Sequence, residues 1–106
     1  MKASVVFVTA PRGRAAQTLA KKIVARRLAA CVNVVPMVVS HYRWKGKMQA
    51  DRESLLVIKT RTTLIAQLSR FVTQNHSYSV PEVIALDVAG GHAPYLQWLA
   101  NETRSR

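Results

Sequence analysis

The sequence predicts a single α+β domain, spanning residues 1–106, whose elements follow the order β-α-β-β-α-β with an added C-terminal helix. Three observations support this prediction. Short runs rich in Val and Ile alternate with two amphipathic segments of helical period. A Lys45-Gly46-Lys47 turn joins the two central runs into a hairpin. The length of 106 residues is that of one domain.

The first strand and the first helix are predicted from a change of hydrophobic period. Residues 3–10 form a short apolar run that ends at Pro11, as expected for a buried strand. From Gly13 to Ala30 the apolar positions recur at helical spacing, while basic and polar residues occupy the other side. No glycine or proline interrupts this segment, so it predicts an amphipathic helix.

The central hairpin is predicted from two β-rich segments. Residues 31–44 are rich in β-branched and aromatic side chains, and residues 53–60 form the returning strand. Pro36 lies inside the first segment, and proline has no N–H to donate, so an edge, a bulge or a bend is required there. The two segments are long enough for the hairpin to project beyond a small domain.

The second half of the chain predicts a helix, a strand and a final helix. Thr62 or Thr63 is expected to cap the second helix, which ends near Asn75. The fourth strand covers 83–88, and Pro94 fits the first turn of the last helix. This order is the split βαβ, or ferredoxin-like, arrangement. Two helices would cover one sheet face, and the apolar opposite face would be covered by a symmetric oligomer.

The charge is strongly positive, with 16 Lys and Arg against five Asp and Glu, a net +11. The basic residues are scattered and form no block of five or six, so a self-repelling basic surface is favoured over a nucleic-acid site. An RNA-recognition domain shares the element order, but its third strand carries aromatic residues. Residues 54–60 carry none. Nucleic acid is therefore not predicted as a partner.

The compartment is inferred from two features. No apolar run approaches ~18 residues, so no membrane span is predicted. Cys31 is the single cysteine, which rules out an intramolecular disulfide and favours a reducing compartment. We therefore expect a cytoplasmic protein.

Common catalytic motifs are missing from the sequence. It contains no GxxxxGK[ST], GxGxxG, CxxC, HExxH or GxSxG. No acid, base and nucleophile can be assembled into one set, so an enzyme is not predicted.

Several single residues leave two interpretations open. His76 can meet Glu82 or Cys31 only through folding, and imidazole with thiolate suits copper or zinc. Cys31 can instead be a small buried hydrophobe. Glu82 can bind a ligand, or form a cap or an ion pair with Lys59. Tyr42 and Trp44, on one face of their strand, can stack on bases or pack at a subunit interface.

Six segments in order along the chain resemble the CutA family of divalent-cation-tolerance proteins. They cover nearly the whole sequence and are specific in combination. The segments are Val8-Thr9-Ala10-Pro11, Arg27-Leu28-Ala29-Ala30-Cys31-Val32-Asn33, Tyr42-Arg43-Trp44-Lys45-Gly46-Lys47, Ile58-Lys59-Thr60, His76-x-Tyr78-x-Val80-Pro81-Glu82-Val83-Ile84-Ala85-Leu86 and Tyr95-Leu96-Gln97-Trp98-Leu99.

The resemblance implies a ferredoxin-like fold and a homotrimer in which hairpins cross between subunits, as in PII signal proteins. It also implies a link to copper tolerance and a ligand site in the cleft between subunits. No cofactor is required, and weak binding of copper or zinc is expected. The implied cleft residues are Trp44, Lys59, His76, Tyr78 and Glu82, and the implied metal ligands are Cys31, His76 and Glu82.

Two segments depart from the pattern of the family. The hairpin is usually acidic after Trp-Lys-Gly, whereas here Lys47, Met48, Gln49 and Arg52 dilute Asp51 and Glu53. The other departure follows His76. Where the family has His-Pro-Tyr-Glu, this chain has His76-Ser77-Tyr78-Ser79. Loss of the proline should loosen the turn, and loss of the glutamate removes an oxygen ligand.

Three functional hypotheses follow. The first is a trimeric binding or sensing protein with a metal or small-ligand site centred on His76. The second is a trimeric interaction scaffold without ligand chemistry. The third is nonspecific binding of anionic partners, or of a small anionic ligand, through the basic surface.

Overall fold

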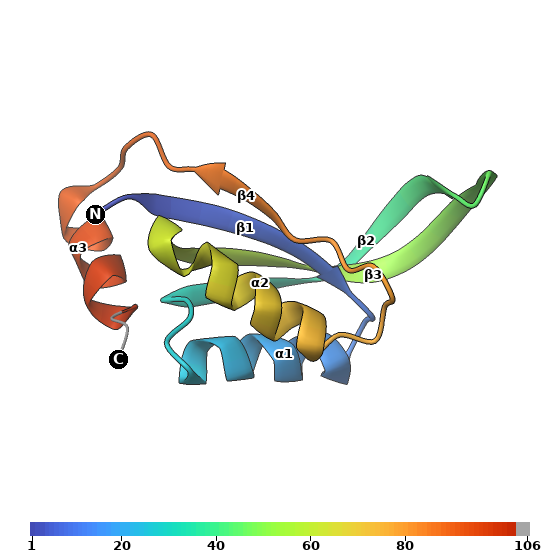
Figure 1. Ribbon diagram of the computed structural model, residues 1–106, viewed down its shortest axis with the longest axis horizontal. Helices are drawn as coiled ribbons and strands as arrows, with labels where there is room; N and C mark the ends of the chain where they lie inside the picture. The colour runs from blue at the N-terminus through green and yellow to red at the C-terminus, as the bar shows by residue number, and fades with distance from the viewer. Residues whose placement is uncertain (104–106) are drawn as a thin grey trace.

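Four antiparallel strands form one sheet in the spatial order β2-β3-β1-β4 (Figure 1). The computed structural model describes residues 1–103, so residues 104–106 of the predicted domain lie outside the described residues. The strands are β1 (Ala3–Ala10), β2 (Cys31–Trp44), β3 (Lys47–Arg61) and β4 (Ile84–Asp87). The helices are α1 (Arg14–Ala25), α2 (Ile65–Gln74) and α3 (Ala93–Glu102), with a short 3₁₀ turn at Thr62–Leu64. The predicted element order and the ferredoxin-like arrangement are confirmed.

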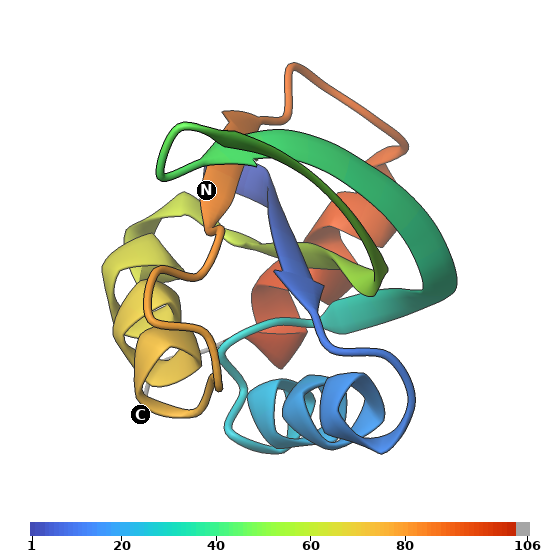
Figure 2. The ribbon, with the colours of Figure 1, turned by 90° about the vertical axis from the view of Figure 1, so that its right-hand side faces the viewer.

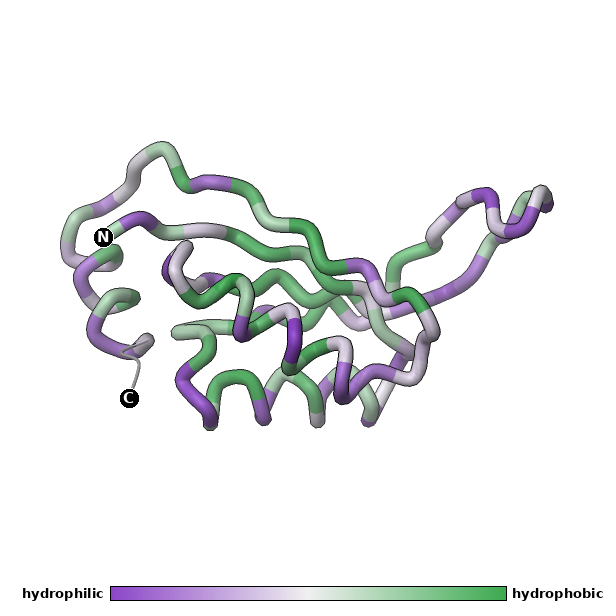
Figure 3. The backbone as a smooth tube through the Cα atoms, viewed as in Figure 1, coloured by the Kyte–Doolittle hydropathy of each residue, from purple (hydrophilic) through white to green (hydrophobic). Residues whose placement is uncertain are grey.

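The core lies between one face of the sheet and helices α1 and α2 (Figures 1 and 2). Alternate residues of β1 and β3 are buried there, and they meet apolar residues of the two helices. The principal members are Val6, Val8, Leu56 and Ile58 from the strands and Leu19, Ile23, Leu68, Phe71 and Val72 from the helices. Figure 3 shows hydrophobic residues along the central strands, whereas the tip of the hairpin mixes both kinds.

The opposite face of the sheet is apolar and largely open. The strand register places the intermediate positions of β1 and β3 on this face, beside Ile84 and Leu86 of β4. Ile84 is 53% exposed and Leu86 is 50% exposed. Helix α3 covers one end, where Leu99 is buried against Ala3 and Ala30. We refer to Val5, Phe7, Leu55, Val57, Ile84 and Leu86 as the open face.

The hairpin of β2 and β3 extends beyond the rest of the sheet and curls at its free end (Figures 1 and 2). Its register shifts between Val35, which pairs with Leu55, and Val38, which pairs with Glu53. One residue of β2 is therefore extra, as in a β-bulge. Pro36 explains the position, because its carbonyl accepts a 2.8 Å hydrogen bond from Ser54 Oγ while its nitrogen cannot donate.

Several boundaries differ from the prediction. Helix α1 ends at Ala25 instead of Ala30 because Arg27 adopts a left-handed φ of 58°. The Arg27 N–H donates to the Val24 carbonyl and the Leu28 N–H to the Ile23 carbonyl, which is a Schellman termination. Strand β3 begins at Lys47, earlier than predicted, and β4 is limited to four residues.

The predicted threonine cap of the second helix is wrong. Thr62 lies in the 3₁₀ turn that precedes α2, and no side-chain cap is found there. The Thr62 hydroxyl is instead 2.7 Å from the hydroxyl of Ser4. The end of α2 before Asn75 and the place of Pro94 in the first turn of α3 agree with the prediction. Along residues 1–103, none of the helices has the length and hydropathy that a membrane crossing needs.

Candidate functional site

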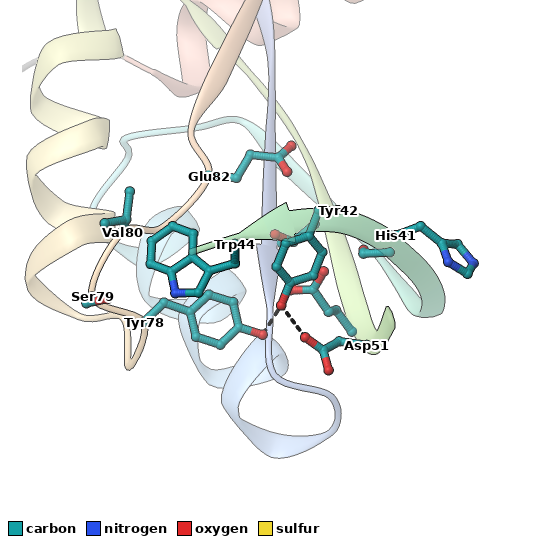
Figure 4. A pocket seen from close by; sticks show the side chains of 11 residues that line it. His41, Tyr42, Trp44, Asp51, Tyr78, Ser79, Val80 and Glu82 are labelled. Atoms are coloured by element: carbon teal, nitrogen blue, oxygen red, sulfur yellow. Dashed lines mark hydrogen bonds between the residues drawn. The ribbon is translucent and has the colours of Figure 1, made fainter. Parts of the chain in front are cut away.

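A hollow of about 630 Å³ lies between the projecting hairpin, the end of β1 and the segment 78–82 (Figure 4). We call it the arm groove. Three separate parts of the chain build it, so it exists only in the folded protein. Its lining residues are Thr9, Ser40, His41, Tyr42, Trp44, Asp51, Glu53, Tyr78, Ser79, Val80 and Glu82.

The bulge in β2 determines which side chains face the arm groove. Side chains alternate along a strand, and one extra residue reverses the alternation beyond it. Cys31 pairs with Lys59 before the bulge, whereas Tyr42 pairs with Gln49 and Trp44 pairs with Lys47 after it. Even-numbered residues of β2 therefore share a face with odd-numbered residues of β3 in the arm. This phase puts the aromatic side chains on the same side as Asp51 and Glu53.

Three carboxylates line the arm groove: Asp51, Glu53 and Glu82. Glu53 is only 6% exposed, and its Oε1 accepts a 2.9 Å hydrogen bond from the hydroxyl of Tyr78. Burial raises the pKa of Glu82, and the negative charge of Glu53 raises it further, while a hydrogen bond with Thr9 partly offsets both. Glu82 therefore holds a proton more tightly than an exposed glutamate does, and a cation beside it would be favoured.

Two tyrosines donate hydrogen bonds to these carboxylates. The Tyr42 hydroxyl donates to Asp51, and that bond is the main reason why its pKa is raised. The pKa of Tyr78 is raised strongly, first by burial and then by its bond to Glu53. Both phenols therefore stay protonated at neutral pH and act as hydrogen-bond donors.

His76 does not line the groove but contacts Tyr78, which does. Its Nδ1 accepts a 3.1 Å hydrogen bond from the Tyr78 backbone N–H. Its Nε2 therefore carries the hydrogen and donates to the Thr9 carbonyl at 2.7 Å. The imidazole also packs on the Tyr78 ring, with centroids 4.6 Å apart. Both nitrogens are engaged, so His76 holds Tyr78 against β1.

The predicted cleft residues divide into two groups. Trp44, Tyr78 and Glu82 line the arm groove, with His76 in contact with Tyr78. Lys59 does not join them, because its Nζ donates to Asn33 Oδ1 farther along the sheet.

Cys31 also lies away from the groove within one chain. It pairs with Lys59, four residues along β3 from Leu55, the partner of Thr9. This separation corresponds to about 13 Å at the strand rise of ~3.3 Å per residue. Among residues 1–103, no three His, Cys, Asp or Glu side chains are grouped closely enough to hold a metal ion.

The sequence prediction left several lining residues out of its site residues, among them Thr9, Tyr42, Asp51 and Glu53. Asp51 and Glu53 are two apart, which already predicts a shared strand face. Whether they share that face with Tyr42 and Trp44 depends on the bulge, and the sequence suggests a bulge only through Pro36. Their proximity to Glu82 depends on the path of residues 76–82, which no local sequence pattern predicts.

Comparison with known proteins identifies relatives over nearly the whole chain. The family model of the CutA1 divalent ion tolerance protein matches residues 4–102. The chloroplastic protein CutA of Arabidopsis thaliana is 54% identical over 101 residues, which are 95% of this chain and 56% of that protein. The divalent-cation tolerance protein CutA of Thermus thermophilus is 46% identical, over 93% of this chain and 96% of that protein.

A solved structure agrees with the fold described above. The crystal structure of CutA1 from Oryza sativa has a TM-score of 0.96 and 50% identity, and the match covers all of this chain and 97% of that one. The chain spans little more than half the length of the plant and mammalian relatives that it matches.

Proposed function

The chain belongs to the CutA1 divalent ion tolerance family, and from this premise we propose that it is a homotrimeric tolerance protein that binds divalent cations at the arm groove. The observation that carries the proposal is the position of the acidic residues. The chain has five Asp and Glu against 16 Lys and Arg, and three of the five line this one hollow. A site for an anion would not be built this way.

The donor atoms suit a divalent cation only in part. The carboxylates and phenols offer oxygen atoms, which hard divalent cations prefer. Copper prefers imidazole and thiolate, and both nitrogens of His76 are already engaged. A single chain therefore supplies Glu53 and Glu82 as the principal donors, and the remaining positions would be filled by water or by a neighbouring subunit.

The homotrimer is proposed from the open face together with the groove. A sheet face lined by contiguous apolar side chains, such as the open face, is normally covered in a stable protein. The open face ends beside the groove, since Leu55 pairs with Thr9, so a chain that covers this face would also lie next to the groove. The cleft between subunits that the sequence predicts would then be completed in the trimer.

Titration calorimetry tests the cation site. We expect Glu82→Gln to weaken the binding of the preferred cation at least about tenfold, since one charged ligand is lost. Asp87→Asn is the matched control, because Asp87 is exposed on β4, outside the groove, and pairs with Lys2 at 3.8 Å. Copper, zinc and manganese are compared, with stoichiometry per trimer. Equal affinities of wild type and Glu82→Gln for every cation would contradict the proposal.

A second candidate is a trimeric interaction scaffold without ligand chemistry. The exposed pair Tyr95 and Trp98 on α3, with ring centroids 5.5 Å apart, favours it. A ligand that binds only the folded state raises the thermal midpoint. A midpoint that no cation changes, in a protein that sediments as a trimer, would favour the scaffold.

The name of the family describes tolerance and not catalysis, and we propose no reaction for the groove. The Arabidopsis relative is chloroplastic by name. The cytoplasmic location of this chain stays a prediction.

A further inference from the structure

The arm groove has aromatic walls as well as carboxylates. Tyr42, Trp44 and Tyr78 come from two separate parts of the chain and line the same hollow (Figure 4). Trp44 is 43% exposed in the single chain, so the chain's own residues leave a large part of its indole uncovered. Three aromatic side chains beside three carboxylates form a different kind of surface from an all-oxygen metal site.

The charge of the lining is selective for cations. Among residues 1–103, no Lys or Arg lines the hollow, although the whole sequence has 16 of them. His41 is among the lining residues, but its ring points away from the other labelled side chains in Figure 4. The groove is therefore acidic in a strongly basic protein, so it would attract a cation and repel an anion.

The tyrosine hydroxyls are held in a way that favours contact with a cation. Tyr42 donates to Asp51 and Tyr78 donates to Glu53. These bonds fix the rings, and donation to a carboxylate increases the electron density of the phenol. A negative ring face attracts a cation placed over it. The rings are thus oriented before any ligand arrives.

The hollow is too large for a single metal ion to fill it. A volume of about 630 Å³ lies within the ~300–1,000 Å³ range of small-molecule pockets. Within residues 1–103, three metal-binding side chains do not converge on one point. A bulkier cation would contact the aromatic and the acidic walls at the same time.

We propose that the arm groove binds a small organic ammonium ion, with its charged head between the aromatic rings and the Glu53–Glu82 pair. This inference rests on the groove of the proposed function but not on its metal chemistry. The ammonium head contacts the faces of the rings, a contact that requires no coordinating lone pairs from the protein. The carboxylates balance its charge. A free small molecule supplies the ammonium group.

The probe pair is choline and its neutral carbon isostere, 3,3-dimethyl-1-butanol. The two have nearly the same shape and differ in charge. Titration calorimetry of the full-length, assembled protein is carried out with EDTA present, so that metal cannot contribute. We expect choline to bind at least about tenfold more tightly than the isostere. Equal binding of the two, or no binding of choline, overturns the proposal.

Variants of Trp44 test whether binding needs an aromatic ring at this position or only a bulky side chain. Trp44→Leu is expected to weaken choline binding on the order of tenfold, while Trp44→Phe keeps a ring and most of the affinity. Trp98→Leu is the matched control, because Trp98 is 42% exposed and lies on α3, outside the groove. Equal losses in Trp44→Leu and Trp44→Phe would show that the ring is not the contact.

Metal titration of the same variants distinguishes the two proposals. Trp44→Leu removes no oxygen donor, so it should weaken choline binding much more than metal binding, whereas Glu82→Gln should weaken both. Metal binding without choline binding overturns the present inference and leaves the divalent-cation proposal standing. Choline binding without metal binding would overturn the divalent-cation proposal and leave the present inference standing.

Discussion

At the scale of single residues, Glu82 connects the charge of the arm groove to the stability of the fold. Its pKa is raised from the ordinary value of 4.5, first by burial and then by Glu53. For an acid whose pKa is raised on folding, the stabilising contribution is present below the unfolded pKa and is lost as the pH rises through the folded pKa. Deprotonation of Glu82 therefore destabilises the native state.

We predict that Glu82→Gln gains stability relative to wild type as the pH rises from 4 toward 7. The amide keeps the shape of the side chain but cannot acquire a charge. Thermal midpoints of both proteins, measured across this range without added cations, check the prediction. The midpoint difference should grow with pH and shrink when the preferred cation is added. A difference that stays constant with pH would contradict the stated origin of the pKa shift.

His76 illustrates what could and could not be predicted at this scale. The sequence drew attention to the segment 76–82, because a histidine, a tyrosine and a carboxylate lie close together in it. The role of the imidazole could not be foreseen, since it depends on the Thr9 carbonyl, 67 residues away in the chain. The distance of Cys31 from this segment follows from strand register, which a single sequence does not give.

At the scale of elements, the hairpin tip combines two residues with left-handed backbone. Lys45 has φ 51° and Gly46 has φ 78°, as a type I′ turn requires. Glycine adopts this conformation freely, whereas lysine is strained by its Cβ. The tip therefore has one favourable and one unfavourable residue.

We predict that Gly46→Ala lowers the free energy of unfolding by about 1–2 kcal/mol and that Lys45→Asn raises it by up to about 1 kcal/mol. A Cβ at Gly46 meets nothing within 4 Å, so the cost comes from the backbone alone. Gly90→Ala is the control, because its Cβ is equally unobstructed and its φ is outside the left-handed range. Chemical denaturation of the three variants measures the differences. Equal losses at both glycines would rule out φ as the cause.

The element prediction succeeded where periodicity is long and failed where tertiary contacts decide. The two amphipathic helices and the hairpin have clear patterns, so their existence and order followed from the sequence. The end of α1 did not follow from the sequence, because Arg27 occupies a position that is usually glycine. Its Nη2 donates to the Asn101 carbonyl at 2.6 Å, and Arg61 donates to the Ala100 carbonyl at 2.5 Å. Both arginines thus stabilise the C-terminal end of α3.

At the scale of the whole molecule, the open face is the surface on which assembly depends. We predict that Ile84→Lys converts the proposed trimer into monomers, because an unpaired charge buried in an apolar interface costs several kcal/mol. Analytical ultracentrifugation measures the mass. Gln17→Lys adds the same charge to the exposed side of α1 and should leave the mass unchanged. A trimer that persists in Ile84→Lys would show that the contact surface lies elsewhere.

The bulge at Pro36 has a consequence for how the length of this hairpin can change during evolution. An insertion or deletion of one residue in β2 between the bulge and the turn would reverse the phase of the strand and move Tyr42 and Trp44 to the other side. A change of two residues would keep them facing Asp51 and Glu53. Relatives that retain the groove should therefore differ in the length of this strand segment by even numbers of residues.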